Sequence, residues 1–182
     1  MDQSGGPSTG VRAVFLVGFM GAGKTSVGQA LGRYLGWTFE DLDDRIVRRE
    51  SLTVAEIFRD RGEIGFREAE QAALVELLAE LRDVPRVIGL GGGTLIREQN
   101  TERVREAGWM VFLDAPIEEL WRRCRQQDAA RPLCQNQGQF RQLYESRRGL
   151  YQRADLRVET AGKSVEAIAA EVACGLNLAQ QR

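Results

Sequence analysis

Eight consecutive residues, Gly18 to Thr25, have the types and spacing needed to hold a phosphate chain. Their sequence, GFMGAGKT, fits the pattern G-x-x-x-x-G-K-[ST] at every fixed position. The glycines let the backbone curl so that successive N–H groups point at phosphate oxygens, and the helix that follows presents its positive end to the same anion. We expect Lys24 to reach the β- and γ-phosphates and the Thr25 hydroxyl to ligate Mg²⁺.

Apolar patterns on both sides of this loop supply the context that the motif requires. Ala13–Val17 is a short apolar run typical of a buried parallel strand. Four apolar residues then recur at helical spacing, Val27, Ala30, Leu31 and Leu35. Of the 25 lysines and arginines only Lys24 and Lys163 are lysines, so one of the two stands in the loop. We therefore interpret the segment as a nucleotide phosphate loop rather than a glycine-rich turn before an ordinary helix.

Two aspartates stand at the end of a short strand candidate, Thr38–Asp41: Asp41 is its last residue and Asp43 follows it. In an extended segment their side chains would lie on the same side. In a doubly wound sheet the carboxyl end of this strand lies beside the phosphate loop. A carboxylate there could align an acceptor hydroxyl and take its proton, while its neighbour supports the Mg²⁺ shell. A solvated acidic turn is the alternative, because Glu40 and Asp44 are acidic too.

Three glycines, Gly91–Gly93, follow the strand candidate Arg86–Leu90. They form either a flexible turn or a surface without side chains that a ligand can approach closely. In many phosphate-loop enzymes a magnesium-linked aspartate stands after the equivalent strand, and here that place is glycine. Asp114, which follows the strand candidate Trp109–Leu113, is expected to cap the strand end or the next helix.

Three arginines are candidate anion ligands. Arg67 lies early on a predicted helix, one turn after Glu63, where a simple i,i+4 ion pair is the alternative. Arg131 lies within the polar stretch Asp128–Gly138, a candidate active-site lid, and Arg147 follows it. Each alone fits a solvated surface arginine, but together they offer bidentate donors for carboxylate or phosphate.

Length and composition are those of a soluble globular protein with one domain. The chain has 182 residues, of which 43% are hydrophobic and 28% are charged. The net charge of −1 gives no bias toward nucleic acid or an anionic membrane, and no apolar stretch approaches the roughly 20 residues that span a bilayer. We expect a monomer that binds small molecules, without nucleic-acid or membrane partners.

The chain contains no histidine, which excludes Ser-His-Asp and Cys-His catalysis and histidine-based metal sites. A carboxylate is then the leading candidate for a general base. The three cysteines, Cys124, Cys134 and Cys174, are odd in number and lack C-x-x-C spacing. This pattern argues against a disulfide framework or a zinc cluster and favours a reducing, cytoplasmic location.

Strand and helix patterns alternate along the chain, which predicts a parallel sheet wrapped by helices. The strand candidates are Ala13–Val17, Thr38–Asp41, Arg86–Leu90, Trp109–Leu113 and Leu156–Glu159. The helix candidates run from about Glu63 to Leu81, from after Pro116, from about Gln139 to Tyr151, and from the N-cap Ser164. Residues 1–10, rich in Gly, Ser, Thr and Pro, predict a disordered leader rather than a targeting signal, and residues 11–182 a single domain.

Taken in order, these motifs resemble those of the shikimate kinase family from about Val14 to Val158. The matching segments are Gly18–Thr25, Asp41–Asp43, Gly62–Glu70, Gly91–Gly93, Arg131–Leu133 and Arg147–Tyr151. The resemblance implies a phosphate-loop α/β fold like that of nucleoside monophosphate kinases, a three-layer sandwich with a five-stranded parallel sheet in order 2-3-1-4-5. It also implies a substrate-binding helical region at about residues 43–70 and a lid at about residues 126–139.

The implied reaction is ATP-dependent phosphorylation of the shikimate 3-hydroxyl, a step toward chorismate and the aromatic amino acids. By resemblance, Asp43 would bind the substrate hydroxyls and serve as a base or aligning group. Arg67 and Arg147 would hold the shikimate carboxylate. The backbone of Gly91, Gly92 and Gly93 would support the ring.

The resemblance also implies a nucleotide and metal site. The implied ATP-binding residues are Gly21, Ala22, Gly23, Lys24, Thr25, Ser26 and Arg131. Lys24, Asp43 and Arg131 form the implied catalytic set, in which Arg131 closes over ATP and stabilises the transferring phosphoryl group. Mg²⁺ is the implied cofactor, ligated by Thr25 with Asp41 in its outer shell.

Two details depart from the family pattern or leave a choice. Gly149 stands where proline is usual, which predicts a looser turn before Tyr151. Arg123 and Arg125 are both candidates to stack on adenine. A gluconate kinase or another small-molecule kinase, and a kinase-like binding protein without activity, are the alternative functions; the neutral charge and small size disfavour a nucleic-acid-dependent ATPase.

Overall fold

The computed structural model of the chain describes residues 13–81, 84–127 and 136–178. The predicted leader (residues 1–10), Arg131 and most of the predicted lid (residues 126–139) lie outside these ranges. Within the described ranges, no helix is both long and apolar enough to cross a bilayer.

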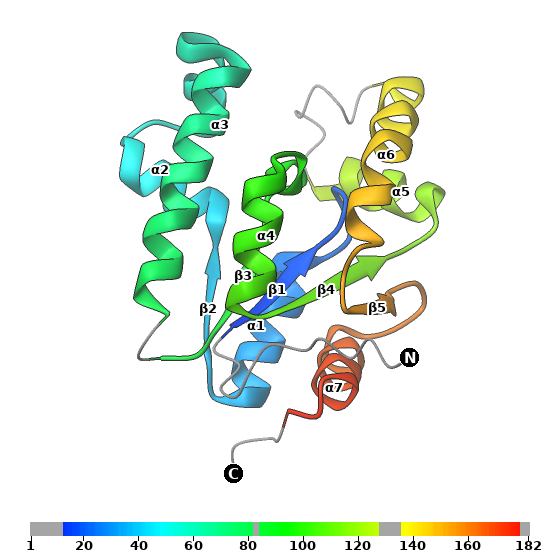
Figure 1. Cartoon of the computed structure of the whole chain (residues 1–182). Helices are drawn as coiled ribbons and strands as arrows, with labels where there is room; N and C mark the ends of the chain where they lie inside the picture. The colour runs from blue at the N-terminus through cyan, green and yellow to red at the C-terminus, as the bar shows by residue number, and fades with distance from the viewer. Residues whose placement is uncertain (1–12, 82–83, 128–135, 179–182) are drawn as a thin grey trace, which may run out of the picture.

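The described residues form a parallel sheet of five strands. These are β1 (Ala13–Val17), β2 (Thr38–Asp41), β3 (Arg86–Gly89), β4 (Trp109–Asp114) and β5 (Leu156–Glu159). Their order, β2-β3-β1-β4-β5, confirms the predicted order (Figure 1). Strand β1 is central, with Val14 aligned with Val87 on one side and with Trp109 on the other.

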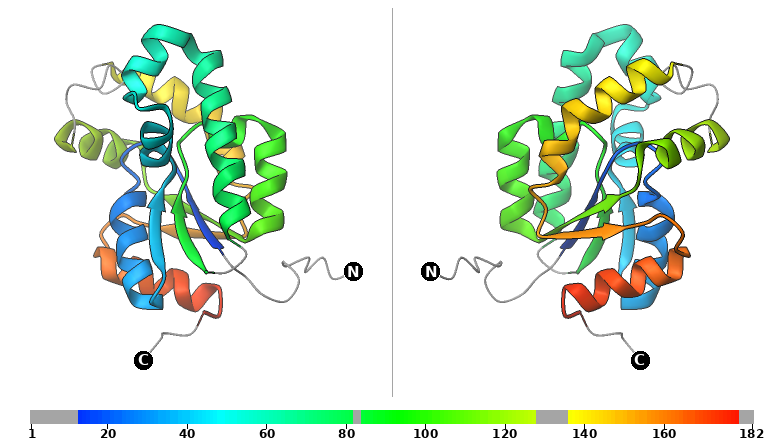
Figure 2. Two further views of the ribbon diagram at one scale, coloured as in Figure 1. Left: turned by 90° about the vertical axis from the view of Figure 1, so that its left-hand side faces the viewer. Right: turned by 90° about the vertical axis from the view of Figure 1, so that its right-hand side faces the viewer.

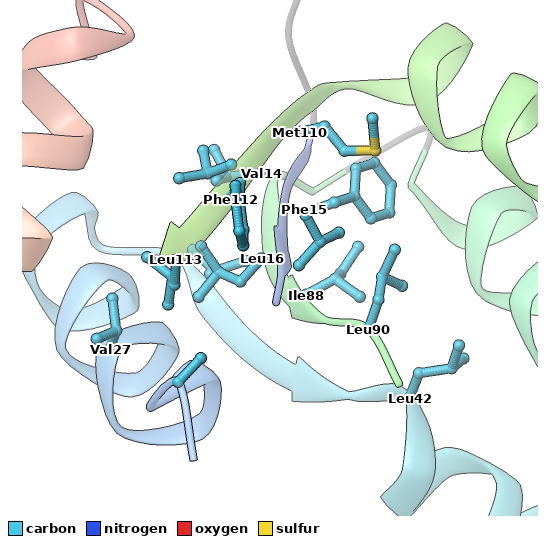
Figure 3. Close-up of a cluster of buried hydrophobic side chains, with 14 of the residues drawn as sticks. Val14, Phe15, Leu16, Val27, Leu42, Ile88, Leu90, Met110, Phe112 and Leu113 are labelled. Atoms are coloured by element: carbon cyan, nitrogen blue, oxygen red, sulfur yellow. The ribbon is translucent and has the colours of Figure 1, made fainter. Parts of the chain in front are cut away.

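Helices cover both faces of the sheet, which explains why every residue of β1 is buried. Helices α1 (Lys24–Leu35) and α7 (Val165–Gly175) lie on one face, and α3 (Val54–Glu80) and α4 (Glu98–Ala107) lie on the other (Figure 2). Phe15 aligns with Ile88 and Met110, and their side chains gather on one side of the sheet (Figure 3). The central sheet thus holds the ends of β1, β2 and β3 in fixed positions.

Most element boundaries agree with the sequence pattern, and the caps explain them. Helix α5 (Ile117–Gln127) begins directly after Pro116, as predicted. Ser164 accepts a hydrogen bond from the N–H of Ala167 and so caps α7, which confirms its predicted role. Helix α6 (Gln137–Tyr151) begins two residues before the predicted Gln139, because Asn136 accepts a hydrogen bond from the Gln139 N–H.

The helix predicted from about Glu63 is confirmed as the second part of α3, and the sequence missed only the first part. The helix begins at Val54, after a capping box in which Thr53 and Glu56 bond reciprocally. A break at Gly62, where φ is 65°, divides α3 in two, and only its second part carries a long apolar face. Two further helices, α2 (Leu42–Glu50) and α4, were not predicted because they bury few apolar residues.

The predicted loosening at Gly149 is wrong. Helix α6 continues through Gly149 to Tyr151, so there is no turn at this point. A β-carbon added at Gly149 would meet nothing within 4 Å among the described residues. The glycine therefore leaves Arg147 and Tyr151 one turn apart on one continuous helix.

The sequence argued against a disulfide framework, and a single bond is the exception. Cys124, a buried residue of α5, is disulfide-bonded, while Cys174 is an exposed free thiol. The partner of Cys124 is not among the described residues.

An ion-pair network surrounds Glu40 of β2. Glu40 accepts hydrogen bonds from Arg45, Arg48 and Arg86 at 2.8–2.9 Å. Arg45 and Arg86 also bond Glu80 at the end of α3. The network connects β2 with α2, α3 and β3, immediately before the residue Asp41.

Gly108 allows α4 to pass close to the start of β1, which yields a stability prediction. A β-carbon at Gly108 would lie 2.2 Å from the carbonyl oxygen of Ala13, a backbone atom that cannot rotate away. We expect Gly108→Ala to destabilise the fold by about 1–3 kcal/mol, measured by urea unfolding. The control Gly149→Ala meets no neighbour, and the better helix propensity of alanine should raise stability by up to about 1 kcal/mol. Equal stability of the two variants would contradict this account.

Candidate active site

The phosphate loop connects β1 to α1 in a strained backbone conformation. Gly18, Gly21 and Gly23 have φ values of 147°, 80° and 89°, which residues with a β-carbon rarely adopt. Lys24 folds back across the loop and donates hydrogen bonds to the carbonyls of Gly18 at 2.9 Å and Phe19 at 3.3 Å. These bonds hold the ammonium group at the mouth of the loop, as the motif predicts.

The loop also lies very close to neighbouring backbone. A β-carbon at Gly18 would be 2.6 Å from the carbonyl oxygen of Leu113, and one at Gly21 would be 2.6 Å from that of Leu120. Gly23 is the N-cap of α1 and has no side chain to bond the first N–H groups of the helix. The loop therefore offers backbone donors and a helix N-terminus to an anion.

Asp41 links the phosphate loop to the end of β2. Its Oδ2 atom accepts a hydrogen bond from the Thr25 hydroxyl at 3.1 Å. Its Oδ1 atom accepts one from the Asp43 N–H at 3.0 Å and so caps α2. The predicted proximity of β2 to the phosphate loop is confirmed, and the solvated acidic turn is wrong for this residue.

Asp43 lies in the first turn of α2 and not on an extended segment, which corrects the expected geometry. The cap at Asp41 starts the helix at once, so the two aspartates do not alternate as in a strand. The Asp43 carboxylate nevertheless reaches the glycine segment: a β-carbon at Gly91 would be 3.1 Å from Asp43 Oδ1.

Both described candidate arginines also reach this segment. A β-carbon at Gly93 would lie 2.4 Å from Arg67 Nη2, and one at Gly92 would lie 3.4 Å from Arg147 Nη1. The structure thus brings Asp43 from α2, Arg67 from α3 and Arg147 from α6 around one bare stretch of backbone. The glycine segment is a contact surface and not merely a flexible turn.

Glu70 is a site residue to which the sequence gave no role. Its side chain is buried, with 1% exposed, and it accepts hydrogen bonds from Arg67 at 2.8 Å and from the Thr94 hydroxyl at 2.7 Å. The pair predicted instead, Arg67 with Glu63, measures 3.7 Å and involves a largely exposed glutamate. The signal was available, since Glu70 falls on the buried face of α3 one turn after Arg67.

The two arginines keep hydrogen-bonding capacity for a ligand. The Nε atoms of Arg67 and Arg147 are buried and have no hydrogen-bond partner within the described part of the chain. Buried donors of this kind are rare unless a ligand or water completes them. A planar carboxylate is well suited to bridge two guanidinium groups.

The position of α5 favours Arg123 over Arg125 as the arginine nearer to the phosphate loop. A β-carbon placed on Gly21 of the phosphate loop would lie 3.4 Å from the β-carbon of Arg123. Its guanidinium bonds Glu119 at 2.8 Å and both oxygens of Thr160 at 3.1 and 3.2 Å. Arg125 is exposed. Arg123 is therefore held beside the phosphate loop, and its contact with adenine stays a prediction.

Asp114 has the structural role expected of it. It is buried and accepts hydrogen bonds from the Ala115 N–H at 2.9 Å and from Arg157 at 2.9 Å. These bonds join the end of β4 to β5. Arg131, the remaining site candidate, lies outside the described residues.

The position of Lys24 yields a binding prediction. Because its ammonium group would bond the phosphates, we expect Lys24→Met to weaken ADP binding about 10- to 100-fold. Lys163→Met is the matched control, since Lys163 pairs with Glu171 on the surface. Isothermal titration with MgADP, after circular dichroism shows that both variants fold, tests this expectation. Equal losses in the two variants would contradict it.

Comparisons with known sequences agree with this geometry. The family model described as shikimate kinase matches residues 20–176. The curated shikimate kinase of Persephonella marina is 35% identical and aligns over 89% of this chain and 97% of its own length. That of Geobacter sulfurreducens is 43% identical, over 92% of this chain and 91% of its own.

Solved structures of kinases are also similar to this chain in fold. Shikimate kinase from Acinetobacter baumannii in complex with shikimate has a TM-score of 0.83 at 34% identity and covers 92% of this chain and 94% of its own. A gluconokinase from Sinorhizobium meliloti has a TM-score of 0.60 at 17% identity, with 92% of each chain covered, which is a likeness of fold alone. With a family model that spans most of the chain and close relatives over nearly their full length, the protein belongs to the shikimate kinase family.

Proposed function

We propose that this protein transfers the γ-phosphoryl group of MgATP to the 3-hydroxyl of shikimate, giving shikimate 3-phosphate and ADP. The observation that carries the proposal is the convergence of Asp43, Arg67 and Arg147 on the Gly91–Gly93 backbone. Shikimate carries one carboxylate and three hydroxyls on a small ring, so two guanidinium groups and one carboxylate are complementary to it. The solved A. baumannii relative with bound shikimate supports the same substrate.

Arg67 and Arg147 bind the carboxylate of shikimate in this proposal. Glu70 orients Arg67 through their 2.8 Å bond, and the buried Nε atoms of both arginines become donors to the ligand. The ring lies on the glycine segment, where side chains would leave no room. This arrangement fixes which hydroxyl faces the phosphate loop.

Asp43 acts on the acceptor hydroxyl. Its carboxylate accepts a hydrogen bond from the 3-hydroxyl and takes the proton as the oxygen attacks phosphorus. A new P–O bond forms to the shikimate oxygen, and the bond to the oxygen bridging the β- and γ-phosphates breaks. The electron pair of that bond stays on ADP. Because the chain lacks histidine, a carboxylate is the appropriate base.

The phosphate loop and Lys24 hold the nucleotide in line for this transfer. Thr25 and Asp41 are hard oxygen donors already joined at 3.1 Å, which fits Mg²⁺, an ion that takes few protein oxygens beside phosphates and water. When bound, Mg²⁺ neutralises charge on the β- and γ-phosphate oxygens. Arg123 supports the adenine base, and Arg131, by family resemblance, covers the phosphates.

We propose a monomer in the cytoplasm that binds shikimate and ATP, with neither nucleic acid nor membrane as a partner. A substrate-binding helical region at residues 43–70 and a lid at residues 126–139 belong to one domain over residues 11–182. The alternatives of a gluconate kinase and of an inactive binding protein are not favoured, because the low-identity likeness to gluconokinase extends to the fold alone.

The role of Asp43 yields a kinetic prediction. In a coupled ADP-release assay, shikimate and not gluconate should stimulate turnover of the wild-type protein. Asp43→Asn should lower kcat by about 10²-fold or more while ADP affinity stays within about twofold. Asp44→Asn, the exposed neighbour on the same helix, is the control and should keep normal kcat. Near-normal turnover by Asp43→Asn would remove this residue from the mechanism.

Recognition of the carboxylate yields a second kinetic prediction. Shikimate methyl ester lacks the negative charge, so its KM should exceed that of shikimate by about 10- to 100-fold in the wild-type protein. Arg147→Met should reduce this ratio by raising the KM of the acid far more than that of the ester. If the ratio of the ester KM to the acid KM is unchanged in Arg147→Met, this arginine does not bind the carboxylate.

A further inference from the structure

We propose that Tyr151 is a positioning residue for substrate binding, because its phenol oxygen joins Arg147 to the carbonyl of Gly92. The inference rests on the proposed function and deepens it. It assigns to one buried hydroxyl the task of holding a carboxylate-binding guanidinium over the glycine segment. Tyr151 does not itself touch the substrate in this proposal.

The first contact is with the glycine segment. The Tyr151 hydroxyl donates a hydrogen bond to the carbonyl oxygen of Gly92 at 2.5 Å. The side chain is 1% exposed, and its ring packs on Phe112 of β4 with centroids 5.5 Å apart. Packing in the core therefore fixes the ring, and the phenol oxygen lies at the glycine segment.

The second contact is with Arg147. Arg147 lies one helical turn earlier on α6, and its guanidinium is near enough to the phenol oxygen to lower the pKa of Tyr151. A β-carbon at Gly92 would lie 3.4 Å from both Arg147 Nη1 and the Tyr151 oxygen, so both groups approach the same glycine. Burial raises the pKa of Tyr151 to about 12, although the nearby charges of Arg147 and Arg67 oppose the rise. The hydroxyl thus keeps its proton for Gly92 at physiological pH.

The position of Arg147 makes such support necessary. It lies one turn before the end of α6, and Gly149, two residues further on, lowers the helix propensity of that end. Among the described residues, no atom packs within 4 Å of the place where a Gly149 side chain would begin. Glu70 orients Arg67 by a direct ion pair, whereas the fixed phenol oxygen of Tyr151 does the corresponding work for Arg147.

The alternative is that Tyr151 is only a core aromatic residue. Tyr151→Phe separates the two roles, because it keeps the ring and removes the oxygen. Tyr144→Phe is the matched control: Tyr144 is also buried on α6, and its hydroxyl faces Asp114 at 3.5 Å instead of the glycine segment.

We expect Tyr151→Phe to raise the KM for shikimate about 10-fold, with the KM for ATP within about twofold of wild type. The ratio between the KM of shikimate methyl ester and that of the acid should fall, as in Arg147→Met. Tyr144→Phe should change none of these values. The double variant Tyr151→Phe with Arg147→Met should lose little more than Arg147→Met alone, because the two groups act together.

A wild-type KM for shikimate in Tyr151→Phe, or fully additive losses in the double variant, would overturn the inference. If Tyr151→Phe does not fold, the same comparison is made in the Gly149→Ala background, which strengthens the last turn of α6. Failure of the proposed function looks different. In that case the wild-type protein itself would not release ADP in response to shikimate.

Discussion

The close approach of charged side chains to the backbone of Gly91–Gly93 is the constraint on which the rest of the site depends. Any side chain at Gly93 would collide with the Arg67 guanidinium, which lies 2.4 Å from the position of its β-carbon. The glycines therefore leave room for the charged side chains that approach this backbone. Strand β3 delivers this segment next to the phosphate loop, since the Leu90 N–H bonds the carbonyl of Leu16 on β1.

Different chemistry surrounds the two arginines that we propose to bind the substrate carboxylate. Arg67 is held by the buried carboxylate of Glu70, which in turn accepts a hydrogen bond from Thr94. Removing two charges from water is costly, so such a pair adds little stability, and its value lies in a fixed geometry. In the proposed site Arg147 has the neutral phenol of Tyr151 beside it instead, and a neutral neighbour would leave its positive charge available to an anion.

The sequence predicted the parts of this protein that depend on local spacing. The phosphate loop, the five strands and the cap at Ser164 follow from short patterns, and the structure confirms them. The sequence correctly predicted that Asp43 lies near the phosphate loop, but it predicted an extended backbone at this residue. Asp43 is helical because the cap formed by Asp41 starts α2, a helix with too little apolar periodicity to be recognised from the sequence.

What the sequence could not predict depends on contacts across the fold. Glu70 lies on the buried face of a helix, and only its neighbours Arg67 and Thr94 reveal its role. The choice of Arg123 over Arg125 required knowing which side of α5 faces Gly21. The disulfide of Cys124 likewise depends on spatial proximity rather than on spacing along the chain.

The two outer strands of the sheet, β2 and β5, have a consequence for behaviour at high concentration. Each has only four residues, TFED and LRVE, and each carries charged side chains. On the edge strand β2, Glu40 is surrounded by arginines, and on the edge strand β5, Arg157 is bonded to Asp114. Short, charged edge strands are poor templates for pairing with a strand from another molecule. The architecture that presents the ligand-binding ends of the inner strands thus also discourages intermolecular sheet extension and aggregation.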